Sequence, residues 1–153
     1  MSEASFWNYL SKLLPAAEGH YTRIESHDTA SGFPDVHYTL NGHTGTIELK
    51  DAKRPGSKYP FSGKSGLRKS QITWMTWECD AGGRVFLALQ CGDRVYILKA
   101  DLYFDELHRM TEEQIADVAT LKWLKGRTKN TSEADGWGTV DMLNLTDLLE
   151  GRL

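Results

Sequence analysis

The first apolar pattern along the chain has the spacing of a helix. Apolar side chains recur every three or four residues and stop at Pro15, which cannot continue a helix. The residues in this pattern are Phe6, Trp7, Leu10, Leu13 and Leu14. They predict an amphipathic helix over residues 3–14, and a second helical pattern predicts a helix over residues 67–79.

The middle of the chain shows the shorter patterns of strands. Val36–Leu40 and His43–Lys50 flank Asn41-Gly42, which is a strong signal for a two-residue hairpin turn. Further apolar runs predict strands over residues 21–26, 85–90 and 95–100. The predicted order is helix, three strands, helix and two strands, which is typical of an α/β fold with helices flanking a central sheet.

The last third of the chain begins with a helix signal. Thr111-Glu112-Glu113-Gln114 has the form of a capping box and predicts a helix that runs to about Lys125 and stops at Gly126. Residues 127–138 are predicted to form a loop. Residues 141–150 fit either a terminal helix or a strand followed by a helix.

Composition narrows the class of protein. The chain has 153 residues, 40% hydrophobic and 25% charged, which suits one compact domain. No stretch approaches the roughly 20 apolar residues of a membrane helix, so we expect an intracellular, cytoplasmic protein without a membrane partner. Cys79 and Cys91 fit thiols that fill space in a reducing compartment. Gly63-Lys64-Ser65 is no nucleotide-binding loop, because six residues separate it from Gly56 where that loop needs four.

Charge is unevenly distributed along the chain. The net charge of −3 argues against a protein that coats nucleic acid indiscriminately, but residues 50–69 contain seven basic residues and one acid, a local charge of +6. This basic loop, over residues 51–66 and the start of the next helix, predicts a clamp on DNA phosphates. The alternative is a solubilising flap. The predicted DNA-binding residues are Lys53, Arg54, Lys58, Lys64, Arg68 and Lys69. Tyr59 and Phe61 either stack on an exposed base or anchor the loop to the core.

The hairpin predicts a cluster of three charged side chains. If Asn41 and Gly42 are the turn residues, opposed residues have numbers that sum to 83, and Asp35 lies directly opposite Glu48. Lys50 lies two residues beyond Glu48 and points to the same face. A bulge at the nearby Gly45 would shift the register and scatter the three side chains.

Two opposed carboxylates in a half-buried sheet are unfavourable unless a cation neutralises them. Oxygen ligands favour Mg²⁺ or Mn²⁺, and zinc is disfavoured because no His or Cys is positioned to join them. The alternative is a surface hairpin on which Asp35, Glu48 and Lys50 form ordinary solvated ion pairs.

The order of these residues resembles a nuclease signature. Gly32-Phe33-Pro34-Asp35, then Ile47-Glu48-Leu49-Lys50, then Gln71 on the next helix resembles the PD-(D/E)XK nuclease superfamily and, within it, the VRR-NUC branch. The match covers roughly residues 3–100. It implies a restriction-endonuclease-like core with a mixed sheet over residues 1–100. Residues 101–153 lie beyond the match, and we expect them to form a C-terminal helical extension packed on the same domain.

The resemblance also implies roles for single residues. Asp35 and Glu48 bind the metal with help from the Leu49 carbonyl, and Lys50 orients or deprotonates the attacking water. Glu3 matches an acid near the start of the first helix in that branch, and its alternative is an exposed acid favoured by the helix dipole. Glu25 is a reserve ligand. Gln71 either contacts the site or caps a buried group.

The implied activity is hydrolysis of DNA phosphodiester bonds with Mg²⁺ or Mn²⁺. Small members of the branch suggest branched DNA such as a Holliday junction, cut by a homodimer, and a phage origin would suit the size. Two alternatives remain open. One is a nuclease acting on linear ends, flaps or a short sequence, and the other is a non-catalytic DNA- or protein-binding module that keeps the fold.

Overall fold

A six-stranded mixed sheet forms the centre of the protein. The computed structural model describes residues 2–24, 32–52, 58–62, 66–100, 106–126 and 142–153. The strands lie in the order in which they occur in the chain, and β3 and β4 run parallel whereas the other neighbouring strands are antiparallel. The predicted α/β class, with a mixed sheet flanked by helices, is therefore confirmed.

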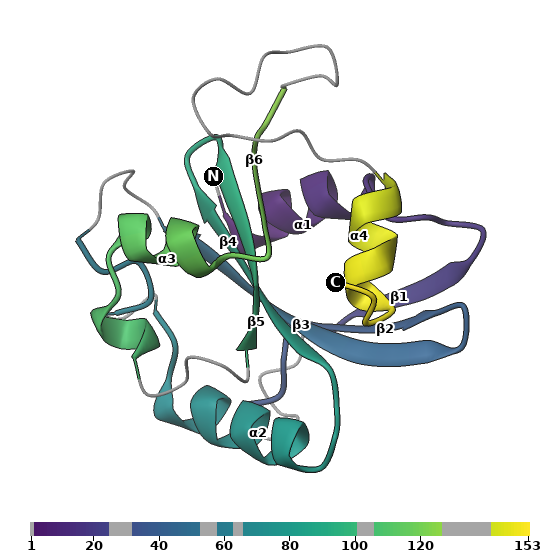
Figure 1. The fold of residues 1–153 in the computed structure, drawn as a ribbon, viewed down its shortest axis with the longest axis horizontal. Coiled ribbons are helices and arrows are strands. Elements are labelled where there is room, and N and C mark those ends of the chain that lie inside the picture. The colour runs from purple at the N-terminus through teal and green to yellow at the C-terminus, as the bar shows by residue number, and fades with distance from the viewer. Residues whose placement is uncertain (1, 25–31, 53–57, 63–65, 101–105, 127–141) are drawn as a thin grey trace.

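The helices and strands follow one another as Figure 1 shows. The strands are β1 (Gly19–Arg23), β2 (Val36–Leu40), β3 (His43–Ala52), β4 (Val85–Cys91), β5 (Arg94–Lys99) and β6 (Leu121–Leu124). The helices are α1 (Glu3–Ser11), α2 (Lys69–Asp80), the short 3-10 helix η2 (Leu107–Arg109), α3 (Glu112–Val118) and α4 (Met142–Leu149). Within the described ranges, no helix has the length and apolar character needed to cross a membrane.

Two hydrophobic clusters cover the two faces of the sheet. Residues of α1 and α4 pack on one face, and Met75 of α2 and Ile115 of α3 pack on the other. The central strands β3 and β4 are buried on both faces, as expected for the parallel pair of an α/β sheet. Beyond His43 and Thr44 at the start of β3, a polar side chain on either of these strands is therefore removed from water.

The β2–β3 hairpin has the predicted register. Its pairs run from Leu40 opposite His43 to Val36 opposite Ile47, so their numbers sum to 83. Asn41 and Gly42 have φ angles of 48° and 81°, the positive values that a tight hairpin turn requires. Gly45 introduces no bulge.

Gly45 instead makes room for an aromatic side chain. The phenol of Tyr38 fills the space that a Cβ at position 45 would occupy, and its hydroxyl donates a hydrogen bond to the Leu149 carbonyl (2.7 Å). This contact ties the hairpin to the end of α4.

The helix predicted over residues 111–125 is wrong in its second half. Thr111 caps α3 as expected, but the helix ends at Val118, and Ala119 is extended. The Thr120 amide donates to the Ile97 carbonyl (2.9 Å), and residues 121–124 form β6 on the open edge of β5. The unpaired edge of β5 supplies backbone partners that outweigh the helical pattern of the local sequence.

Other boundaries differ by a few residues. α1 ends at Ser11, before Pro15 and not at residue 14, because the residue before a proline is disfavoured in helical conformation. β3 continues to Ala52 and thereby takes Asp51 out of the expected loop. β1 begins earlier than expected, at Gly19, and α2 begins later, at Lys69. The predicted loop over residues 127–138 lies outside the described residues, and the C-terminal element is a helix, α4.

The burial of Trp123 allows a test of β6. Trp123 is 1% exposed, and its Nε1 donates to the Tyr9 hydroxyl (2.9 Å). We expect Trp123→Ala to lower the free energy of unfolding by about 3–5 kcal/mol, because it leaves a cavity in the core. Urea unfolding measures the change, with the exposed Asp117→Ala on α3 as a control that should stay within about 0.5 kcal/mol. Equal effects of the two substitutions would contradict the packing of β6.

Candidate active site

Asp35 and Glu48 meet where the hairpin strands end their pairing. Val36 opposite Ile47 is the last pair of β2 and β3, so Asp35 is the next residue on the side of Glu48. The Leu49 amide donates a hydrogen bond to Asp35 Oδ2 (2.8 Å). The backbone of β3 therefore holds the Asp35 carboxylate beside Glu48.

Glu48 is also held by two side chains. The Glu48 side chain is 1% exposed, and the Lys50 side chain is 8% exposed. Lys50 Nζ lies 3.5 Å from Glu48 Oε1, and Gln71 Nε2 donates to the same oxygen (2.7 Å). The structure thus brings Asp35, Glu48, Lys50 and Gln71 together from the start of β2, the middle of β3 and the first turn of α2.

The first turn of α2 fixes the orientation of Gln71. The Arg68 amide donates to Gln71 Oε1 (2.9 Å), which leaves the Nε2 group of Gln71 directed at Glu48. The Gln71 side chain therefore makes both contacts, one with the Arg68 amide at the helix start and one with Glu48 in the site. The sequence left two roles open for Gln71, a contact with the site and a capping contact, and the geometry combines them.

Gly32 allows the segment before β2 to pack tightly against α2. Its φ is +90°, and a Cβ at this position would overlap the carbonyl of Ser70. The next residue, Phe33, packs edge-on against Trp74 with ring centroids 4.8 Å apart. The glycine of the Gly32-Phe33-Pro34-Asp35 motif thus sets the distance between Asp35 and the helix that carries Gln71.

Burial dominates the electrostatics of Glu48. The pKa of Glu48 is raised to about 9, first by desolvation and then by the charge of Asp35, while the charge of Lys50 acts in the opposite direction. Glu48 Oε2 is buried and has no hydrogen-bond partner among the described residues. A cation beside this oxygen would supply the missing partner, and two carboxylates are the hard oxygen donors that Mg²⁺ and Mn²⁺ prefer. The residues present therefore fit such an ion.

Glu3 lies at the edge of this cluster. It is half-buried on α1, and its pKa is raised first by desolvation and then by the charge of Asp35, while Lys50 lowers it. Across the part of the chain that the structure describes, however, no group of three acidic, His or Cys side chains is gathered closely enough to hold a metal. The candidate ligands among the described residues are thus Asp35 and Glu48 with the neighbouring Leu49 carbonyl, and Glu3 lies at the edge of this set without completing it.

Comparisons with known proteins identify the fold. No protein-family model matches the chain, and no curated protein matches its sequence. Among solved structures, it is similar to the 1.6 Å structure of Archaeoglobus fulgidus Hjc, a Holliday junction resolvase from an archaeal hyperthermophile. The TM-score is 0.50 and the identity 16%, over 77% of this chain and 91% of that chain. The chain has a restriction-endonuclease-like fold.

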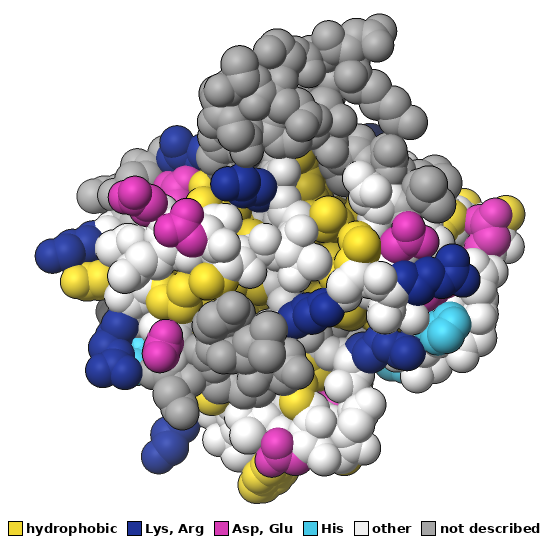
Figure 2. All heavy atoms as spheres, viewed as in Figure 1, with side chains coloured by type: hydrophobic (Ala, Val, Ile, Leu, Met, Phe, Trp, Pro, Cys, Tyr) yellow, Lys and Arg dark blue, Asp and Glu magenta, His cyan; other side chains and the backbone are white. Residues whose placement is uncertain are grey.

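The basic residues are only partly placed on this restriction-endonuclease-like fold. Three predicted DNA-binding residues lie outside the described residues: Lys53, Arg54 and Lys64. The reserve metal ligand Glu25 lies outside them too. Arg68 and Lys69 are exposed at the start of α2, and Lys58 is exposed in the described segment 58–62. On the face shown in Figure 2, basic side chains alternate with acidic ones and do not form a single patch.

The two aromatic residues of the loop have different environments. Phe61 is 0% exposed and anchors the segment to the core on the α2 side of the sheet. Tyr59 is 38% exposed, with Lys58 Nζ 5.4 Å from the centre of its ring. Of the two roles considered from the sequence, Phe61 has the anchoring one, and Tyr59 is accessible from solvent.

A buried polar pair on the other face of the sheet escaped the sequence analysis. Gln90 Nε2 donates to Asp51 Oδ1 (3.0 Å), and Gln90 Oε1 accepts from Lys125 Nζ. Lys125 also lies 4.5 Å from the ring centre of Tyr9. The signal in the sequence was a polar residue in each of two apolar strands. Because Asp51 follows Lys50 directly, this network holds the end of β3 from the face opposite Lys50.

The raised pKa of Glu48 predicts a stability effect in metal-free protein. The folded state binds a proton that the unfolded state releases above about pH 4.5, so the free energy of unfolding falls as pH rises toward 9. Glu48→Gln imitates the protonated acid and should be more stable than the wild type at pH 8, on the order of 2–4 kcal/mol, with little difference near pH 4. Urea unfolding in EDTA at both pH values measures this. The exposed Glu18→Gln serves as the control, and an equal effect of both substitutions would refute the burial argument.

Proposed function

We propose that the protein is a metal-dependent DNA endonuclease that uses Mg²⁺ or Mn²⁺. The observation that carries the proposal is the buried Glu48 carboxylate, which lies beside Asp35 and is held by Lys50 and Gln71 with one oxygen unpartnered among the described residues. A purely structural ion pair gains little from this arrangement, because burying charges costs more than one imperfect contact returns. A site that binds a cation and then hydrolyses a phosphodiester explains both the burial and the free oxygen.

Each residue has a specific role in this proposal. Asp35, Glu48 and the Leu49 carbonyl would hold the ion, with Glu3 as a further candidate ligand. The bound ion lowers the pKa of water and offsets negative charge on the reacting phosphate. Lys50 Nζ lies 3.5 Å from Glu48 Oε1, where its ammonium form can orient the attacking water and its neutral amine form can accept a proton from that water. Gln71 keeps the Glu48 carboxylate in one orientation.

For the substrate, we propose branched DNA of the Holliday-junction type. Support comes from the fold shared with a Holliday junction resolvase and from the exposed basic residues Lys58, Arg68 and Lys69. Lys53, Arg54 and Lys64 would extend this contact. A homodimer suits a substrate with two equivalent strands to cut.

The position of the chain within the nucleases is also proposed. We place it in the VRR-NUC branch of the PD-(D/E)XK superfamily, with a phage origin. The catalytic core would span residues 1–100, and residues 101–153 would form an extension of the same domain.

Lys50→Ala is the direct test of the catalytic assignment. We expect loss of cleavage by at least about 100-fold, because general acid–base groups contribute about 10²–10⁴-fold. The assay follows a labelled four-way junction and its matched linear duplex with Mg²⁺, Mn²⁺ or EDTA. The exposed Lys12→Ala removes the same side chain away from the site and should cleave as the wild type does.

The outcomes of this assay separate the parts of the proposal. Junction-selective cleavage that needs the metal and Lys50 supports all of it. Equal cleavage of both DNAs keeps the nuclease and removes the junction preference. Cleavage that survives in Lys50→Ala, or an inactive wild type with every ion and DNA, overturns the active site and favours a binding module.

Gln71→Met tests the positioning role. This substitution keeps the volume and removes the amide that donates to Glu48. Partners that orient a metal-binding residue contribute about 10–100-fold to metal affinity or activity, so the Mg²⁺ concentration for half-maximal cleavage should rise by about that factor. A Mg²⁺ titration measures the change, and circular dichroism checks that α2 is retained. An unchanged Mg²⁺ dependence would limit Gln71 to its capping contact with Arg68.

A further inference from the structure

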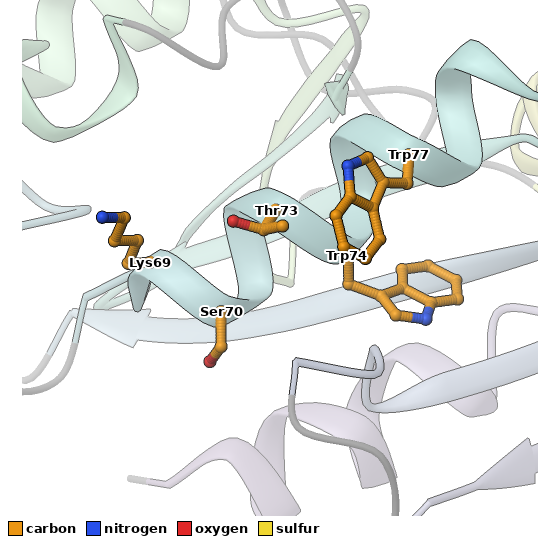
Figure 3. Close-up of a pocket in the computed structure, with 5 residues that line it drawn as sticks. All are labelled: Lys69, Ser70, Thr73, Trp74 and Trp77. Carbon is orange, nitrogen blue, oxygen red and sulfur yellow. The ribbon is translucent and has the colours of Figure 1, made fainter.

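The outer face of α2 carries an exposed tryptophan beside a groove. Trp77 is 70% exposed, and a cavity of about 410 Å³ is lined by Lys69, Ser70, Thr73, Trp74 and Trp77 (Figure 3). The opposite face of the same helix carries Gln71 and Met75 into the core. A tryptophan side chain typically contributes about 150–250 Å² of contact surface, so the exposed Trp77 beside this groove offers a partner a large apolar contact.

The groove has a firm base. Figure 3 shows the Trp77 ring standing out from the helix and the Trp74 ring lying below it. Trp74 is half-buried and packs against Phe33, which belongs to the segment that leads to Asp35. Trp74 therefore gives the groove a base that is packed against Phe33, whereas the Trp77 side chain is largely exposed.

The charges along this face are self-complementary. Lys69 and Asp80 are both exposed, and neither forms an ion pair with another described residue. They lie 11 residues apart, which is about three helical turns, so they occupy the same line along α2 about 16 Å from each other. A positive charge thus stands at one end of this line and a negative charge at the other, and the groove residues Thr73 and Trp77 lie to one side of it in between.

We propose that a second copy of this chain binds here, with the two α2 helices packed antiparallel about a two-fold axis. Each Trp77 would enter the groove of the other copy, and each Lys69 would face the partner's Asp80. A two-fold interface must be complementary to itself, and the order of charge, groove and opposite charge along α2 meets that condition. DNA is a poorer occupant, because the exposed Asp80 at the far end of this line repels phosphates.

This interface would place the two active sites symmetrically. Gln71 contacts Glu48 from the inner face of the helix whose outer face forms the contact, so each site would lie one helix away from the two-fold axis. On the basis of the proposed function, the partner in the homodimer is then bound through α2, and the dimer presents two equivalent sites to a symmetric junction.

Trp77→Ala tests the aromatic contact without DNA or metal. Sedimentation equilibrium should give a dimer for the wild type and at least about a 30-fold weaker association for Trp77→Ala, as expected of a central aromatic contact. Tyr59→Ala removes another exposed aromatic side chain outside the groove and should leave the association unchanged. A wild type that is monomeric at all concentrations overturns the proposal.

Charge reversal gives a test that misfolding cannot imitate. Lys69→Asp alone and Asp80→Lys alone each bring like charges together in their homodimers, so each should associate at least about 10-fold more weakly. In a mixture of the two variants, the introduced aspartate faces the introduced lysine, and the other contact keeps its native pair. Heterodimers should therefore form with nearly wild-type affinity. Failure of the mixture to recover association overturns the antiparallel arrangement.

The remaining outcomes separate this interface from the catalytic proposal. If Trp77→Ala weakens DNA binding while the molecular mass stays that of a dimer, the groove contacts DNA and the interface is wrong. If the dimer behaves as expected and no DNA is cut, the interface stands and the proposed activity fails. If a monomeric wild type cuts junctions, the activity stands and the interface fails.

Discussion

The burial of the Glu48 carboxylate is the constraint on which the site depends. Moving an ionised group from water into a protein interior costs several kcal/mol, a large share of the stability of a small domain. Lys50 and Gln71 offset part of that cost at Oε1, while Oε2 has no partner among the described residues. The fold thus keeps a group at its centre that is stable as an anion only when further positive charge lies beside it.

The register of β3 decides which side chains share that environment. Because side chains alternate across a strand, Glu48 and Lys50 face the helix that carries Gln71, and Asp51 faces the opposite side with Gln90. A slip of one residue would exchange the two sets. The close fit of Tyr38 over Gly45 opposes such a slip, and the hydrogen bond from Tyr38 to Leu149 extends this restraint to α4.

Local signals account for what the sequence predicted well. The Asn41-Gly42 turn predicts the observed register, so the juxtaposition of Asp35 and Glu48 followed from a few neighbouring residues. Nonlocal contacts account for the failures. β6 forms because β5 offers an open edge, which no pattern within residues 111–125 encodes. Asp51 and Gln90 pair across parallel strands 39 residues apart in the chain.

Some of the sequence-based assignments stay predictions. The catalytic and metal-binding roles of the clustered residues are proposed from their types and geometry, and among the described residues Glu3 does not complete a group of three metal-binding side chains. The assignment of residues 1–100 as core and 101–153 as extension stays a prediction too, although β6 joins the sheet and α4 packs on it. Contacts between distant segments, not local patterns, join these parts.

Helix α2 reverses the usual distribution of polar and apolar residues. Its inner face buries Gln71, and its outer face exposes Trp77. The polar residue is compensated by its bonds to the Arg68 amide and to Glu48, whereas the tryptophan gains a favourable environment only when a partner covers it. Binding at the outer face would therefore stabilise the same helix that orients Glu48. Dimerisation at the outer face of α2 and the orientation of Glu48 at its inner face would then be coupled through this helix.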